Sequence, residues 1–242
     1  MIFINKNFIN IFNNIKLLEW IPVPERGYGS SGLLFENILG LKNNSLQSAD
    51  YNGIEIKVKS IFSKFPLTLF SLCFNNQNFS ELQRFVNSYG VVDKTYNVKV
   101  MTVKIKANEY TFWGKNIRLK LICDKKKKKI FLLVKHSNGK IIEKKCFWDY
   151  ESLSNLIKCK ITNICIVNCA WRTMYNFKFV NFLDISFFKL ISFEKFLDAI
   201  EDGSIFIKIK CGVHNSGKNK GQAYYHGIEF QINYDDLFKI FN

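Results

Sequence analysis

Residues 27–60 read GYGSSGLLFENILGLKNNSLQSADYNGIEIKVKS and contain, in order, a loop, a helical pattern, a polar segment and a strand pattern. A glycine- and serine-rich loop over 27–32 leads into a helical pattern over 33–41, and a polar segment then runs to Asp50. The segment 54–58 alternates as a strand does, because successive side chains of a strand point to opposite faces. The apolar residues of this predicted strand share one face, which is expected to pack on a core: Ile54, Ile56 and Val58.

The opposite face of the same strand carries Glu55 and Lys57. An acid and a lysine on a packed strand are costly unless they line a wet, functional cleft. Asp50 ends the adjoining turn, where its carboxylate can lie beside that of Glu55. Two adjacent carboxylates suit Mg²⁺, so Asp50 and Glu55 are candidate metal ligands, and Lys57 can orient the attacking water. This predicts phosphodiester hydrolysis, although so short a pattern also occurs on solvated strand faces.

The stretch 27–60 resembles the MvaI/BcnI restriction endonucleases, relatives of the MutH nicking enzyme among the PD-(D/E)xK nucleases. The likeness is carried by 29–32, 35–40, 43–44 and 49–57, with Ala49 in place of the usual proline, and more weakly by 221–232. The resemblance implies a Mg²⁺-dependent, sequence-specific DNA endonuclease. It also implies that Asp50, Glu55 and Lys57 are catalytic and that Glu36 is an accessory acid.

The expected fold class is α/β (α+β). We expect a restriction-endonuclease-like core with a mixed central β-sheet flanked by helices, together with a DNA-recognition lobe. A length of 242 residues suits a single endonuclease domain with two lobes. The catalytic lobe is predicted around 27–110 and the DNA-recognition lobe mainly in 111–230.

The composition favours a folded nucleic-acid-binding protein. Lys and Arg number 35 against 20 Asp and Glu, a formal charge of +15, although codon bias of an AT-rich genome would also enrich lysine. A membrane partner is not expected, since the sequence has no apolar run of 18 residues, no lipidation motif and no signal-peptide pattern. Seven cysteines without Cys-x-x-Cys spacing indicate reduced thiols of a cytoplasmic protein.

Periodicity and turn residues place the remaining elements. Helices are predicted over 5–19, 80–89, 149–159 and 192–201, with Ser192 as the cap of the last. Strands are predicted over 63–74, 97–106, 117–123, 130–135, 141–148, 161–167, 205–210 and 228–232. The segment 212–227 is glycine-rich and polar, and we expect a long functional loop there.

Three segments supply candidate DNA-binding residues. The lysine run 125–129 lies at a predicted loop tip and suits phosphate contacts, or it is a merely solvated turn. The segment 168–189 interleaves aromatic and basic residues, which can contact bases but more often belong to the core. The expected loop 212–227 holds histidines that could read guanine or make structural hydrogen bonds. The candidates are Lys126, Lys127, Arg172, His214, Lys218, Lys220, Tyr225 and His226.

The hypothesis is a type II restriction endonuclease that cleaves double-stranded DNA with Mg²⁺, works as a monomer and depends on a cognate DNA methyltransferase as a functional partner in the same cell. A MutH-like strand-nicking enzyme of DNA repair is an alternative, to be distinguished by whether one strand or two are cut. A non-catalytic nucleic-acid-binding module is an alternative of another class, to be distinguished by incubating plasmid with and without Mg²⁺.

Overall fold

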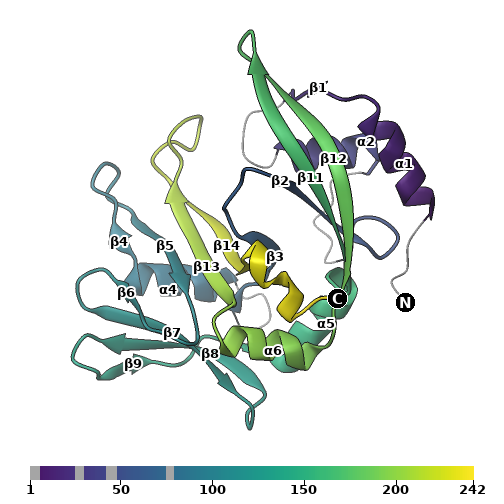
Figure 1. The fold of residues 1–242 in the computed structure, drawn as a ribbon. Coiled ribbons are helices and arrows are strands. Elements are labelled where there is room, and N and C mark those ends of the chain that lie inside the picture. The colour runs from purple at the N-terminus through teal and green to yellow at the C-terminus, as the bar shows by residue number, and fades with distance from the viewer. Residues whose placement is uncertain (1–5, 25–29, 42–47, 75–78) are drawn as a thin grey trace. The chain divides into compact units, whose positions relative to one another are not determined.

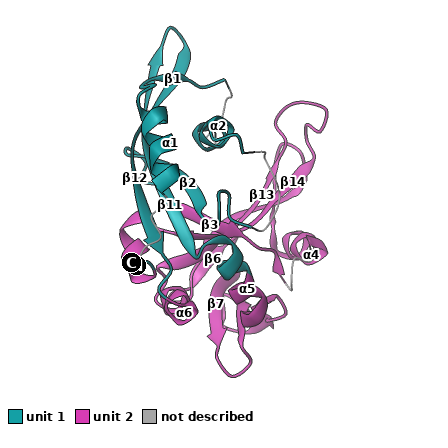
Figure 2. Cartoon of the chain, turned by 90° about the vertical axis from the view of Figure 1, so that its right-hand side faces the viewer, with its two compact units in different colours: residues 1–65, 156–191, 241–242 teal, residues 66–155, 192–240 magenta. Residues whose placement is uncertain are grey.

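The computed structural model describes residues 6–24, 30–41, 48–74 and 79–242. The chain divides into two compact units, each assembled from separated segments (Figure 2). Unit 1 comprises residues 1–65, 156–191 and 241–242, and unit 2 comprises 66–155 and 192–240. The boundary at 65/66 falls inside the range 27–110 that was predicted for the catalytic lobe. The assignment of a DNA-recognition lobe to 111–230 stays a prediction.

Unit 1 is built on a four-stranded sheet in the order β1-β12-β11-β2. The strands are β1 (Ile21–Pro22), β2 (Glu55–Ser60), β11 (Asn163–Met174) and β12 (Phe177–Lys189). β11 runs parallel to β2, whereas β12 is antiparallel to both β1 and β11. The sheet is therefore mixed, as the sequence predicted.

Among its described residues, unit 1 also contains the helices α1 (Lys6–Lys16) and α2 (Ser30–Ile38). Phe8, Phe12 and Ile15 recur at helical spacing along α1, and all three are buried. They join Phe35 of α2 in one cluster with the apolar residues of the sheet, among them Ile54, Ile56, Cys165, Val167 and Phe182. The apolar face of the strand over 54–58 thus packs on this core.

Unit 2 holds two further sheets whose pairings are all antiparallel. One has the order β10-β8-β7-β6 with β9 beside β8, and the other has the order β3-β14-β13-β5-β4. The strands of the first are β6 (Thr111–Trp113), β7 (Ile117–Asp124), β8 (Lys129–His136), β9 (Ile141–Glu143) and β10 (Phe147–Asp149). Those of the second are β3 (Leu67–Ser71), β4 (Val91–Val92), β5 (Lys99–Ile105), β13 (Ile205–Val213) and β14 (Ala223–Ile232).

The described helices that lie wholly in unit 2 are α4 (Phe79–Tyr89), α6 (Phe193–Glu201) and the 3₁₀ helix η1 (Tyr234–Lys239). Ser192 is the N-cap of α6, as predicted, and its hydroxyl accepts a hydrogen bond from the Lys195 amide at 3.1 Å. α5 (Tyr150–Lys160) begins in unit 2 and ends in unit 1. Among the described residues, no helix has the length and hydropathy needed to cross a membrane.

The loop expected over 212–227 is shorter than predicted: residues 214–222 lie between the two strands, whereas 212–213 belong to β13 and 223–227 to β14. β13 and β14 continue their pairing through Cys211↔Tyr225 to Val213↔Ala223. The register shifts beside Lys210, opposite Gly227, whose φ of +95° suits a β-bulge. Glycine-rich polar residues resemble a loop in sequence, but here they form the end of a hairpin. The expected glycine-serine loop also ends early, since Ser30 to Gly32 belong to α2, and 27–29 lie outside the described residues.

The segment 168–189 is a long β-hairpin made by β11 and β12 (Figure 1). The expectation that its aromatic residues are mostly core holds for Phe182, which is fully buried. It fails at the hairpin tip, where Tyr175 is 90% and Phe177 is 68% exposed. The tip turns through Tyr175 and Asn176, which have positive φ values of 48° and 65°.

Candidate active site

A tight turn positions the first candidate ligand. Tyr51 and Ile54 exchange backbone hydrogen bonds of 3.0 and 2.8 Å across Asn52 and Gly53. Both central residues have positive φ, 46° and 78°, the conformation that an Asn-Gly pair adopts readily in a two-residue hairpin. Asp50, one residue outward from Tyr51, therefore faces Glu55 across the turn.

Glu55 is the most deeply buried acid of the site, with 2% of its side chain exposed. Its Oε1 accepts a hydrogen bond from Lys57 Nζ at 2.6 Å, which fits two residues on one face of β2. Its Oε2 lies 3.3 Å from Lys160 Nζ but accepts no hydrogen bond from any residue that the structure describes. Burial raises the pKa of Glu55, and the neighbouring charge of Lys57 opposes that rise.

Glu36 shares this electrostatic environment. It lies on α2, the helix that buries Phe35 in the core of unit 1. Burial is the main cause that raises the pKa of Glu36, and the charge of Asp50 raises it further. The charges of Lys57 and Lys160 act in the opposite direction. The structure therefore brings Glu36, Asp50, Glu55 and Lys57 together in one unit.

Lys160 is a member of this cluster that the sequence did not suggest. It is the last residue of α5, and β11 begins just after it, at Asn163. Because β11 runs parallel to β2 and pairs Ile164 with Glu55, the end of α5 meets the start of β2. A backbone hydrogen bond of 3.2 Å from the Ala49 amide to the Cys159 carbonyl ties the two segments together.

The donor set fits a magnesium ion. Asp50 Oδ2 accepts a hydrogen bond from the Ile56 amide at 2.9 Å, and no described residue donates to its Oδ1. Glu55 Oε2 is a buried oxygen to which no described residue donates a hydrogen bond. Among the described residues, no three His, Cys, Asp or Glu side chains form a ready metal cage. Two carboxylates suffice for Mg²⁺, which keeps several waters and takes substrate phosphate oxygens as further ligands.

The β13–β14 hairpin gathers the histidines predicted to contact DNA. The rings of His214 and Tyr224 lie 4.9 Å apart, and those of Tyr224 and His226 lie 4.5 Å apart, edge to face. Tyr224 is not among the candidates that the sequence predicted, although its spacing of two from His226 is that of residues on one strand face. Gly212 permits this arrangement, since a Cβ there would lie 3.2 Å from the Tyr224 ring.

The other candidates of this hairpin are placed differently. Tyr225 points to the opposite strand face from His226, and its ring packs edge to face against Phe79 at 5.4 Å. Lys218 and Lys220 are exposed in the loop between the two strands. The structure therefore brings His214 and His226 together and separates Tyr225 from them.

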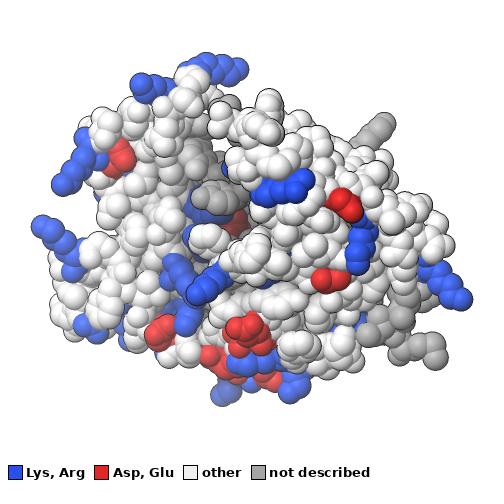
Figure 3. All heavy atoms as spheres, turned by 45° about the horizontal axis from the view of Figure 1, so that its top comes forward, with Lys and Arg blue, Asp and Glu red and all other residues white. Residues whose placement is uncertain are grey.

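The remaining basic candidates lie in two further places. The Arg172 guanidinium lies over the Trp20 ring at 4.1 Å, in unit 1. Lys126 and Lys127 are exposed on the turn between β7 and β8, in unit 2. Their neighbours in the lysine run are engaged, because Lys125 pairs with Glu201 at 3.2 Å and Lys129 with Asp149 at 3.6 Å. Basic side chains are spread widely over the face shown in Figure 3, in keeping with the charge of +15.

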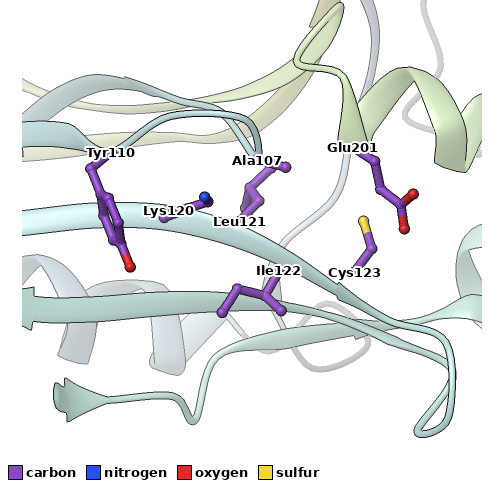
Figure 4. A pocket seen from close by; sticks show the side chains of 7 residues that line it. All are labelled: Ala107, Tyr110, Lys120, Leu121, Ile122, Cys123 and Glu201. Carbon is purple, nitrogen blue, oxygen red and sulfur yellow. The ribbon is translucent and has the colours of Figure 1, made fainter.

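A shallow depression of about 290 Å³ in unit 2 has none of this chemistry (Figure 4). Its potential nucleophile, Cys123, is held as a neutral thiol because burial raises its pKa to about 12. Its one acid, Glu201, already pairs with Lys125. The depression is lined by Ala107, Tyr110, Lys120, Leu121, Ile122, Cys123 and Glu201.

Comparison with known proteins bears on the fold and on the family of the chain. A structure described as a restriction endonuclease MvaI–cognate DNA substrate complex matches with a TM-score of 0.91 and 24% identity, over 98% of this chain and 96% of that one. Restriction endonuclease MvaI in the absence of DNA matches with a TM-score of 0.61 and 23% identity, over 96% and 93% of the two chains. These likenesses confirm the predicted fold class, and no curated protein gives a significant match. The sequence model of the MvaI/BcnI restriction endonucleases matches residues 9–241, so this chain belongs to the MvaI/BcnI restriction endonuclease family.

Proposed function

We propose that this chain is a type II restriction endonuclease that hydrolyses double-stranded DNA with Mg²⁺, using Asp50, Glu55 and Lys57. Membership of the family gives the class of reaction, a site-specific deoxyribonuclease. The observation that carries the assignment of residues is the contact of 2.6 Å between Lys57 and the buried Glu55, beside Asp50 at the adjoining turn.

Each member of the cluster has a distinct role in the proposal. Asp50 and Glu55 would hold Mg²⁺, which when bound supplies Lewis acidity at the phosphate and lowers the pKa of bound water. Lys57 orients the attacking water and offsets charge that develops on the phosphate. Glu36, at the edge of the cluster, assists as an accessory acid.

The DNA contacts in the proposal are divided by type. His214 and His226, with Tyr224 between them, contact base edges, and Lys218, Lys220, Lys126 and Lys127 contact phosphates. Tyr225 supports the hairpin from its other face. In unit 1, Arg172 and the exposed tip of the β11–β12 hairpin contact the duplex. We further propose that the enzyme acts as a monomer in the cytoplasm, with a cognate DNA methyltransferase protecting the same site.

A cleavage assay on unmodified plasmid tests the proposal. Wild-type protein should cut with Mg²⁺ and not with a chelator, and sequencing of the ends should return one short site. Glu55→Gln and Lys57→Met should each lower the cleavage rate by about 10²–10³-fold or more, because each removes a group that acts at the phosphate. Gel shifts in chelator should show nearly unchanged DNA affinity, since dispersed basic contacts supply most of it.

Two exposed residues serve as controls, Glu19→Gln and Lys158→Met, and neither should alter cleavage. Cleavage that survives both active-site changes would place the chemistry elsewhere. Cutting of one strand only would favour the nicking enzyme, and DNA binding with no cleavage under any metal would favour the non-catalytic module.

A further inference from the structure

Glu55 is flanked by two lysines, one at each carboxylate oxygen. Lys57, from its own strand, is 2.6 Å from Oε1, and Lys160, from the end of α5, is 3.3 Å from Oε2. The proposed mechanism uses Lys57 but gives Lys160 no task. Only 19% of the Lys160 side chain is exposed, and its Nζ also lies 3.5 Å from the Ser48 carbonyl oxygen. Lys160 is therefore held against the site by two contacts.

Lys160 offsets negative charge that the carboxylates of the site carry when no cation is bound. A carboxylate that is only 2% exposed needs a counter-charge, because removing one partner of a buried pair leaves an uncompensated charge. Three carboxylates meet here, those of Glu36, Asp50 and Glu55, and Lys57 alone would leave the set strongly negative. Lys160 supplies the second positive charge.

The same position conflicts with metal binding. No described residue donates a hydrogen bond to Oε2 of Glu55, so this oxygen keeps its lone pairs for a new ligand. An oxygen that ligates magnesium lies about 2.0–2.1 Å from the ion. If the Lys160 ammonium stayed in contact with the same oxygen, it would lie only a few ångströms from the ion and would repel it. Lys160 has to give up Oε2 before that oxygen can ligate a cation.

We propose that Lys160 is a positioning residue that occupies Oε2 of Glu55 while the metal site is empty and is displaced when a divalent cation is bound. This inference rests on the proposed function of Asp50 and Glu55 as metal ligands. It makes Lys160 a competitor of the metal: it steadies the metal-free site and weakens metal affinity. A lysine that served only to pack α5 against the turn at Ser48 would have no such effect.

The test is a binding titration that needs no cleavage. Tb³⁺ luminescence, sensitised by the protein's aromatic residues, reports direct binding, and displacement by Mg²⁺ or Ca²⁺ gives their affinities. Lys160→Met keeps most of the side-chain stem and removes the charge, so the dissociation constant for each cation should fall about tenfold. Lys160→Gln should behave alike, and Lys160→Arg, which keeps the charge, should stay near wild type.

Lys158→Met, an exposed neighbour on the same helix, should leave cation affinity unchanged. Melting curves supply an independent readout: Lys160→Met should melt at a lower temperature in chelator yet gain more from added Ca²⁺ than wild type does. Unchanged or weaker cation affinity in both Lys160→Met and Lys160→Gln would overturn the inference. The proposed function is tested separately by Glu55→Gln, because wild-type affinity in that variant would show that Glu55 is not a ligand.

Discussion

Asp50 Oδ2 accepts a hydrogen bond of 2.9 Å from the backbone amide of Ile56, the residue that follows Glu55. The side chain of one proposed metal ligand is thereby fastened to the strand that carries the other. The spacing of the two carboxylates is set by the Asn52-Gly53 turn and this hydrogen bond. The geometry of the site thus depends on local backbone conformation, which can be perturbed without touching either acid.

Gly53→Ala should damage both stability and catalysis. Gly53 has a φ of +78°, where a Cβ costs about 1–2 kcal/mol even though the space around it is open. A loss of about 1 kcal/mol should lower the melting temperature by about 2–4 °C, and a shifted turn should misplace Asp50 and slow cleavage. Gly139→Ala is the matched control, since Gly139 has a φ of +93° in another open turn. It should lower the melting temperature similarly and leave cleavage unchanged; equal cleavage by both variants would contradict the proposed dependence.

Glu36→Gln should change how stability depends on pH. Burial and then the charge of Asp50 raise the pKa of Glu36 above its ordinary 4.5, so the folded state binds the proton more tightly than the unfolded state does. The stability that Glu36 contributes is fully present below about pH 4.5 and is lost as the pH rises through the folded-state pKa. Glutamine does not titrate, so the stability of the Glu36→Gln variant does not fall with pH for this reason.

Melting temperatures in chelator between about pH 4 and 8 provide the measurement. The difference between Glu36→Gln and wild type should shift in favour of the variant as the pH rises, whereas Glu19→Gln, at an exposed position, should track wild type. A difference that is constant with pH would mean that Glu36 does not titrate in this environment.

The lysine turn should contribute affinity without specificity. Among the described residues, the ammonium groups of Lys126 and Lys127 form no ion pair, whereas those of Lys125 and Lys129 pair with Glu201 and Asp149. Replacing Lys126 and Lys127 with serine should weaken binding equally for cognate and random DNA, and should reduce the salt slope by about 0.9 for each phosphate that is no longer neutralised. The matched double variant Lys125→Ser, Lys129→Ser should change the slope less. A weakening confined to cognate DNA would instead assign base contacts to this turn.

Tyr175, at the tip of the β11–β12 hairpin, should lower the stability of the fold and strengthen DNA binding. Tyr175 is 90% exposed in a left-handed conformation (φ 48°), which suits asparagine better than tyrosine. Tyr175→Asn should raise the melting temperature by about 2–4 °C per kcal/mol of relieved strain and weaken DNA binding several-fold. Tyr175→Phe should bind like wild type, because it keeps the ring. Full DNA affinity in Tyr175→Asn would remove the tip from the interface.

The sequence predicted those parts of the site that are local in the chain. Asp50, Glu55 and Lys57 lie within one turn and one strand, where alternation and an Asn-Gly pair determine which side chains share a face. Lys160 joins them only because β11 pairs in parallel with β2, and no local pattern encodes that pairing. The place of Lys160 beside Glu55 therefore depends on the topology of the sheet.

The loop over 212–227 was predicted too long for a different reason. Glycine and polar residues favour loops on average, yet here the backbone groups pair across the hairpin and a bulge at Gly227 absorbs the register shift. Recognising that extension would have placed Tyr224 beside His226, two residues apart on one strand face, and Tyr225 on the other.

The last prediction concerns how one chain cuts two strands. The described part of the chain presents one cluster of this kind, Asp50, Glu55 and Lys57, and one such site holds a single scissile phosphate in line at a time. If the enzyme acts as a monomer of 28.4 kDa, cutting a duplex takes two successive events. Supercoiled plasmid should therefore pass through a nicked circle at limiting and at saturating enzyme alike, and scattering measurements should find one chain on each cognate duplex. Mixing wild type with an excess of Glu55→Gln at saturating DNA should slow neither step, because monomers do not share sites. Direct conversion to linear DNA, together with two chains on one duplex and inhibition by the inactive variant, would show that a second copy supplies the second cut.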